Sequence, residues 1–180
     1  MKKLSIVLVI AAAALLVNAP AQAKIGVGIN WNAGIQDVMV LPIKMQSGLI
    51  IEPMVGFQKI DKNVNAGVGE TDFSVGARIE KHSKSDGITP VFGGFAAVDL
   101  TSLDFPSTLV AADGDAKDSF TDFVFGVYVG GSVPVADMFD VVGTWGPAVT
   151  IIGSRVEGGD GATNFSTQAS LVLRWWLWGE

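Results

Sequence analysis

The chain has 180 residues, a formal net charge of −6 and no cysteine. The negative charge excludes a long basic surface for nucleic acid, and the lack of cysteine excludes both disulfides and lipid attachment at an amino-terminal cysteine. The 22 glycines are scattered through apolar segments, which favours tightly curved β-sheet over helix.

Residues 1–23 have the features of a cleavable secretory signal peptide. Lys2 and Lys3 precede an apolar run, 4–17, and small residues at Ala21 and Ala23 follow it. The run is too short for a transmembrane helix, which needs about 20 apolar residues. We therefore expect cleavage after Ala23 and a single mature domain, 24–180.

The mature chain predicts eight β-strands, since apolar and polar residues alternate with period two between groups of turn-forming residues. The predicted strands are 25–31, 38–45, 49–59, 71–81, 88–100, 119–133, 138–155 and 163–178. Short connections (46–48, 82–87 and 134–137) alternate with mostly longer ones (32–37, 61–70, 101–118 and 156–162). This pattern is typical of an antiparallel up-and-down transmembrane barrel with tight periplasmic turns and longer outer loops.

The last predicted strand, TNFSTQASLVLRWWLW, has the clearest alternation. Leu171 and Trp175 share its apolar face, whereas Ser170 and Arg174 lie on the other face. A membrane-crossing strand needs about 9–11 residues, with aromatic side chains at both membrane surfaces. The expected girdles are Trp31, Phe57, Phe73 and Phe165 at the outer rim, and Phe92, Trp175 and Trp178 at the inner rim. We expect the first and last strands to pair, because a bilayer does not tolerate unpaired backbone groups.

Four features of the sequence point to a known family. They are the predicted signal peptide, the Gly-rich alternating strands, the Leu-Pro-Ile-Lys segment at 41–44 and the aromatic last strand. With these features the chain resembles the small eight-stranded bacterial outer-membrane proteins, which include the OmpA membrane domain and the OmpX/Ail group. The resemblance implies an outer-membrane location, contact with outer-membrane lipid and lipopolysaccharide, and recognition by the barrel-assembly machinery. Family members usually end on an aromatic residue, whereas here Gly179 and Glu180 follow Trp178.

Strand parity predicts a cluster of charged side chains inside the barrel. Its members are Lys44, Glu52, Arg78, Glu80 and Arg174, with Asp72 and Asp99 nearer the outer end. A charged gate or ion pathway is one interpretation. We favour a structural salt-bridge cluster, because eight strands enclose a lumen that side chains fill and buried charges must be paired. The Tyr128 hydroxyl can bridge such a network.

His82 is the only histidine, and it lies in a predicted periplasmic turn next to Ser83. A barrel-type outer-membrane enzyme that modifies lipid A uses a histidine, a serine and an acid, so His82, Ser83 and Glu80 form an alternative hydrolase hypothesis. A surface turn is the simpler interpretation, since lipid A lies in the outer leaflet. No other spacing indicates a catalytic, metal or cofactor site.

The longest predicted loop, 101–118, is acidic. Asp113-Gly-Asp115 has the spacing of part of a calcium loop, but the closing glutamate of an EF-hand is missing. We expect solvated loop charge that is available to a surface ligand.

Three hypotheses for function follow. The chain is a structural or interaction barrel of the outer membrane, a lipid A-modifying hydrolase, or a soluble periplasmic barrel of lipocalin type. The first is favoured, because the charges share a strand face with glycine and serine, as a crowded polar lumen requires. It predicts no enzymatic activity and no cofactor.

Overall fold

The computed structural model describes residues 23–32, 37–61, 68–83, 87–104, 118–155 and 159–178, without the side chains of Asn32 and Trp178. The strands in this part of the chain are β1 (Lys24–Asn32), β2 (Val38–Val40), β3 (Ile43–Lys44), β4 (Leu49–Ile60), β5 (Gly69–His82), β6 (Thr89–Asp104), β7 (Ser119–Ala136), β8 (Phe139–Ile152) and β9 (Ala162–Trp178). Because β2 and β3 are two parts of one predicted strand, the predicted eight-stranded all-β fold is confirmed. Residues 1–22 of the predicted signal peptide 1–23 lie outside the described residues, so the signal peptide and its cleavage site stay predictions.

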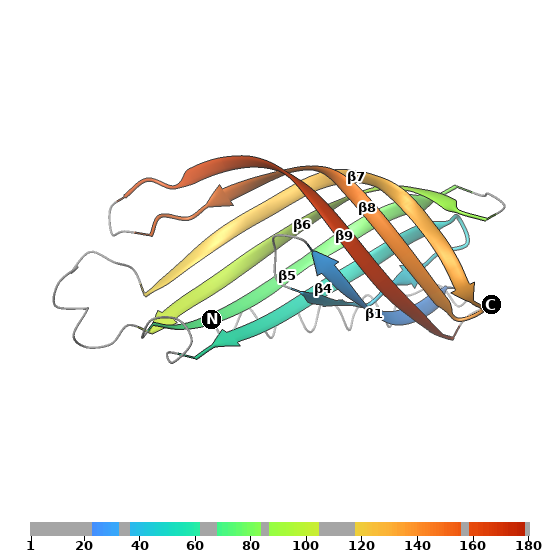
Figure 1. Ribbon diagram of the computed structural model, residues 1–180, viewed down its shortest axis with the longest axis horizontal. Coiled ribbons are helices and arrows are strands. Elements are labelled where there is room, and N and C mark those ends of the chain that lie inside the picture. The colour runs from blue at the N-terminus through green and yellow to red at the C-terminus, as the bar shows by residue number, and fades with distance from the viewer. Residues whose placement is uncertain are drawn as a thin grey trace.

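The sheet closes into an antiparallel barrel (Figure 1). On one side β1 pairs with β2 and β3, and on the other it pairs with β9, where Trp31 lies opposite Leu171. The predicted pairing of the first and last strands is thus confirmed. The turn at Ser47 and the turn at Asp137 lie at the same end of the barrel, here called the short-turn end. The opposite end is the long-loop end.

The predicted strand 38–45 is interrupted at Leu41 and Pro42. Proline has no backbone N–H to donate to a ladder, so a regular strand cannot continue through Pro42. The remaining groups still bind the neighbouring strands, since the Pro42 carbonyl accepts from the Gly26 N–H at 2.9 Å and the Leu41 N–H donates to the Pro53 carbonyl at 3.0 Å. The barrel wall therefore stays closed across the interruption.

The predicted turn 134–137 is wrong, because β7 continues to Ala136. A bulge between Pro134 and Ala136 absorbs the missing proline donor. Likewise, β6 enters the predicted loop 101–118, and the Leu103 N–H donates to the Asp118 carbonyl at 2.7 Å. Alternation fails at these ends, since strands that leave the bilayer no longer need an apolar face.

The two faces of the barrel differ sharply in composition. Outward positions carry large exposed apolar side chains on every long strand, among them Ile29, Val55, Ile79, Phe92, Val129, Trp145 and Leu171. Inward positions are buried. They include two arginines and two glutamates, and an apolar cluster that contains Val40, Val91, Val142 and Val172. A lipocalin-type barrel has the opposite arrangement, so this alternative is not supported. No helix in the described part of the chain is long and apolar enough to span a membrane.

Candidate functional site: a buried ionic network in the lumen

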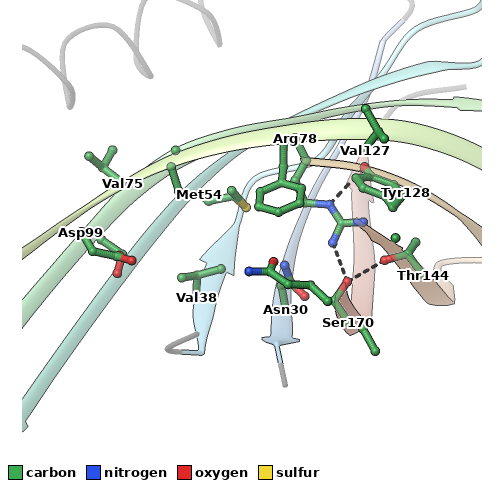
Figure 2. A pocket seen from close by; sticks show the side chains of 17 residues that line it. Asn30, Val38, Met54, Val75, Arg78, Asp99, Val127, Tyr128, Thr144 and Ser170 are labelled. Carbon is green, nitrogen blue, oxygen red and sulfur yellow. Dashed lines mark hydrogen bonds between the residues drawn. The ribbon is translucent and has the colours of Figure 1, made fainter. Parts of the chain in front are cut away.

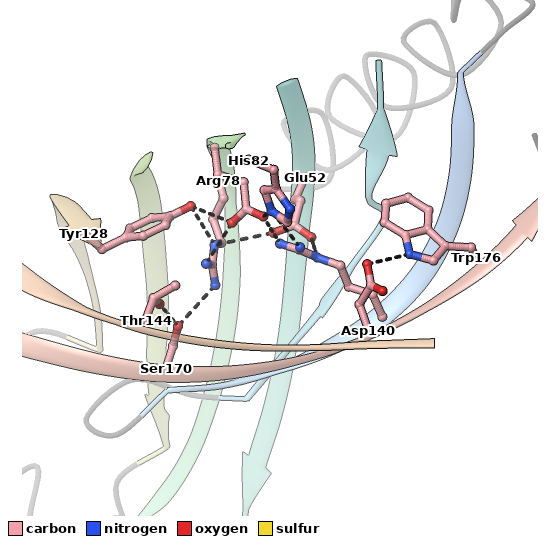
Figure 3. A network of polar contacts seen from close by, with 10 residues as sticks. Glu52, Arg78, His82, Tyr128, Asp140, Thr144, Ser170 and Trp176 are labelled. Atoms are coloured by element: carbon pink, nitrogen blue, oxygen red, sulfur yellow. Dashed lines mark hydrogen bonds and ion pairs between the residues drawn. The ribbon is translucent and has the colours of Figure 1, made fainter. Parts of the chain in front are cut away.

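Three strands bring four charged groups together inside the barrel. Glu52 lies on β4 directly opposite Arg78 on β5. Glu80 follows two residues later on the same face of β5, and Arg174 extends from β9. The exposed fractions of these four residues are 2% or less. We call these residues, together with His82, Tyr128 and Ser170, the lumen network (Figure 3).

Arg174 binds both carboxylates. Its Nε donates to Oε1 of Glu52 at 2.6 Å, and its Nη2 donates to Oε1 of Glu80. All three side chains are fully buried. The planar guanidinium group suits this double contact, because its donors are fixed in one plane and it keeps its charge in proteins. Arg174 therefore connects β9 to two strands on another part of the barrel wall.

Arg78 binds the other side of the same carboxylates. Its Nη2 lies 3.4 Å from Oε2 of Glu80, and its Nε lies 3.5 Å from Oε2 of Glu52. The same Nε donates to the Tyr128 hydroxyl at 3.2 Å, and Nη1 donates to Oγ of Ser170 at 3.2 Å. Two arginines thus balance two glutamates, and this balance reduces the cost of burying all four charges.

The Tyr128 side chain reaches the lumen network by passing across Gly93, which lies on the strand between them. Its hydroxyl donates to Oε2 of Glu80 at 3.2 Å, and its ring lies under the Arg78 guanidinium, 4.6 Å from Cζ to the ring centroid. On β6, between these strands, Gly93 pairs with both Glu80 and Tyr128. A Cβ atom at Gly93 would lie 2.6 Å from the tyrosine hydroxyl oxygen. The missing side chain at Gly93 therefore makes room for the tyrosine ring.

His82 belongs to the lumen network, which corrects its interpretation as a surface-turn residue. Its Nε2 lies 2.6 Å from Oε1 of Glu80 and 3.5 Å from Nη1 of Arg174, and its side chain is only 7% exposed. Because β5 continues to His82, the side chain points inward with Glu80. Ser83 follows on the exposed surface, and its described contact is a backbone bond to Pro90. The structure does not bring a serine–histidine–acid set together here.

Lys44 lies apart from the lumen network. Among the described contacts it forms no ion pair with Glu52, and its Nζ lies over the Trp176 ring, 5.8 Å from the centroid. Trp176 in turn donates from Nε1 to Oδ2 of Asp140 at 2.8 Å. Lys44, expected in the charge cluster, instead pairs with Ile50, two residues nearer the short-turn end than the position opposite Glu52, and it contacts Trp176.

Acidic side chains line the lumen toward the long-loop end. Asp99 lies opposite Asp122 across the β6–β7 ladder, and Asp72 faces the same region from β5. Arg155 offsets part of this charge, with its Nη2 2.8 Å from Oδ2 of Asp122 and its Cζ 3.1 Å from the Phe120 ring centroid. In the described ranges no group of three or more acidic or histidine side chains is arranged to hold a metal ion. Asp113 and Asp115 lie outside the described residues.

A cavity of about 40 Å³ lies between the lumen network and these acids (Figure 2). Arg78, Tyr128 and Ser170 bound it on the network side, and Asn30 and Asp99 line its walls. Oδ1 of Asn30 is buried without a protein partner. The walls of the cavity are mainly apolar, but its volume has room for a few water molecules, and one beside Asn30 would satisfy this oxygen. Side chains and a small cavity therefore fill the lumen at this level.

Most of the expected girdle residues lie near the strand ends. Phe57, Phe73 and Phe165 lie toward the long-loop end, and Phe92 and Trp175 toward the short-turn end. Trp31 does not lie at the outer rim as expected, because it is the ladder partner of Leu171 in the middle of β9. All six point outward, with Phe73 the least exposed of them. Phe57 and Phe73 are ladder partners on β4 and β5. The side chain of Trp178 is not among those described, and the girdle function remains a proposal.

No protein-family model and no curated protein sequence matches the chain. Its structure is similar to the crystal structure of Neisserial surface protein A (NspA), with a TM-score of 0.50, 15% identity, and coverage of 86% of this chain and 96% of that one. A major outer membrane protein from Thermus thermophilus gives a TM-score of 0.45 at 11% identity, covering 85% and 99%. Acinetobacter baumannii CarO gives 0.38 at 9% identity, covering 88% and 100%.

The likeness to NspA, at 15% identity, shows a shared fold. Together with the apolar outer face and the buried charged interior, this fold defines a class: the small eight-stranded β-barrel of outer-membrane type.

Proposed function

We propose that this chain is a bacterial outer-membrane barrel with a structural or interaction role. In this proposal the barrel anchors the long loops at the cell surface, and the lumen network makes the interior a rigid plug. The observation that carries the proposal is Arg174 bound to both Glu52 and Glu80 inside an apolar-faced cylinder. Such charges are stable in a lumen only when paired, and pairing them fills the space that a pore would need.

The proposed partners are lipid on the outer face, lipopolysaccharide around the rim, and the barrel-assembly machinery at the last strand. A surface ligand at segment 101–118 is a further proposed partner. The outward apolar side chains support the lipid contact, because only a hydrocarbon environment makes their exposure favourable.

We also propose that the barrel has no hydrolase activity. The contacts of His82 support this, since its Nε2 is engaged by Glu80 and lies near Arg174 rather than next to a serine hydroxyl. A general base must reach the proton that it removes, and this nitrogen faces two charged partners instead.

The test combines membrane folding with conductance. The purified protein, folded into detergent and then into vesicles, should migrate differently before and after boiling, as a stable barrel does. In planar bilayers it should give no stable, large single-channel conductance. A large steady conductance from the unmodified protein would show that the lumen network gates a pore and does not plug it. Failure to fold into lipid would reject the membrane barrel itself.

A further inference from the structure

The short-turn end contains a second polar site, separate from the lumen network. A hollow of about 350 Å³ opens there, lined by Lys24, Lys44, Asp137, Asp140 and Trp176 and by the end of β7. Trp176 is buried at 6% exposure, whereas both lysines are half-buried and Asp137 is exposed. Charged side chains of both signs therefore surround one space.

The two lysines form an unfavourable pair by themselves. Lys24 and Lys44 lie directly opposite each other in the β1–β3 ladder. Like charges in such a position destabilise a sheet, because their side chains are only a few ångströms apart. Within the described part of the chain neither lysine forms an ion pair, and the described contact of Lys44 is with the Trp176 ring at 5.8 Å. The predicted cleavage after Ala23 would add the α-ammonium group of Lys24 to the same place.

Trp176 separates the lysines from the aspartates. Along the barrel wall it lies on β9, between β1 with Lys24 and β8 with Asp140. Its ring lies under Lys44, and its Nε1 donates to Oδ2 of Asp140 at 2.8 Å. No lysine–aspartate ion pair crosses the hollow among the described contacts, so each charge contacts the tryptophan or faces the open space. The result is a positive wall and a negative wall on either side of one indole ring.

From this arrangement we propose that the hollow binds a small zwitterion, a molecule that carries both a carboxylate and an ammonium group. The carboxylate lies between Lys24 and Lys44 and relieves their repulsion. The ammonium group binds Asp137 and Asp140, and the part between the two charges lies over Trp176. Free amino acids and the ends of short peptides have this chemistry, and the hollow has room for a molecule of that size.

The Trp176 indole N–H is the reporter for the test. The folded protein in lipid nanodiscs, with 15N-labelled tryptophan, is titrated with glycylglycine, acetate or ethylammonium, and Trp176→Phe assigns the resonance. Glycylglycine should shift the Trp176 indole N–H resonance in a saturable way, because its ammonium group binds the Asp140 carboxylate that accepts the indole hydrogen bond. Acetate alone and ethylammonium alone should each bind more weakly than glycylglycine by a factor of about ten at least, since each makes half of the charge-assisted contacts.

Matched variants separate binding from folding. Lys44→Gln and Asp137→Asn should each weaken glycylglycine binding about tenfold, whereas Lys44→Arg should retain it. Lys59→Gln, which changes an exposed lysine on β4 near the long-loop end, should have no effect. The absence of a saturable shift with glycylglycine, equal binding of acetate, or full binding by both neutral variants would overturn the zwitterion site. Each of these results would leave the membrane barrel and its plugged lumen intact.

Discussion

Nε of Arg174 lies 2.6 Å from Oε1 of Glu52, although 122 residues separate them in the chain. The two residues are on β9 and β4, which are not neighbours in the sheet. Their contact therefore crosses the lumen instead of following a ladder. It joins the carboxy-terminal strand to the first half of the barrel through a fully buried ion pair.

Removal of one partner from this pair should be costly. Glu52→Ala leaves Arg78 and Arg174 with Glu80 as the remaining carboxylate, so one buried positive charge loses its compensation. We expect the free energy of unfolding to fall by about 3–5 kcal/mol if the site stays dry, and by less if water enters. Urea unfolding in lipid vesicles measures this change in the free energy of unfolding. Asp160→Asn, an exposed loop change, is the control and should stay within about 0.5 kcal/mol; an equally small effect at Glu52 would contradict the network's structural role.

The second prediction tests which face contacts lipid. Leu171 points outward from the middle of β9 and is 45% exposed. Leu171→Arg should make the folded barrel in vesicles less stable by about 2–4 kcal/mol, because it places a cation near the bilayer centre. Thr163→Arg, at the end of the same strand, should cost about 0–1 kcal/mol. Equal costs at the two positions would show that the apolar band is not embedded as we propose.

The third prediction concerns the space under Tyr128. Gly93→Ala places a methyl group 2.6 Å from the tyrosine hydroxyl and 2.6 Å from the Ile79 carbonyl. The resulting strain should destabilise the barrel by about 1–3 kcal/mol. At Gly143, on β8, a Cβ would meet nothing within 4 Å, so Gly143→Ala is the matched control. It should be neutral or slightly stabilising. If thermal unfolding ranks the two variants in the reverse order, the close approach is not present.

The fourth prediction tests the girdles by the depth of single tryptophans. Trp175 lies near the short-turn end of β9, whereas Trp145 lies in the middle of β8 and Trp31 lies opposite Leu171 in the middle of β9; all three point outward. In variants that keep one of these tryptophans and replace the others with phenylalanine, brominated lipids quench the fluorescence according to depth. Bromines near the headgroups should quench Trp175 most strongly, and bromines near the chain ends should quench Trp31 and Trp145. Uniform quenching at all depths would reject a separate girdle at the short-turn end.

Much of the fold was predictable because a membrane imposes one strict pattern on every strand. Alternation indicated which residues face outward, and the antiparallel pairing of the consecutive strands β4 and β5 places Glu52 beside Arg78. The contact of Arg174 with both glutamates was not predictable in this way. It depends on the stagger of strands around the closed barrel, which no local stretch of sequence specifies.

Two local errors have simple physical causes. Pro42 interrupts a strand that the alternation made continuous, while Lys44 pairs with Ile50 and contacts Trp176 instead of the glutamates. His82 was assigned to a turn, although its parity matches that of Arg78 and Glu80, and one further residue of strand brings it into the network. Strand ends are set by backbone pairing, so hydrophobicity alone locates them poorly.

The position of Arg174 in the last strand has a consequence for how the barrel is made. Until β9 is in place, the growing sheet holds Glu52 and Glu80 against one guanidinium group, that of Arg78, and therefore carries an excess negative charge in its interior. Arrival of Arg174 completes the backbone seam with β1 and neutralises that charge in a single event. We therefore expect a barrel that lacks β9 to be destabilised both by the uncompensated buried carboxylate and by the open edge of β1.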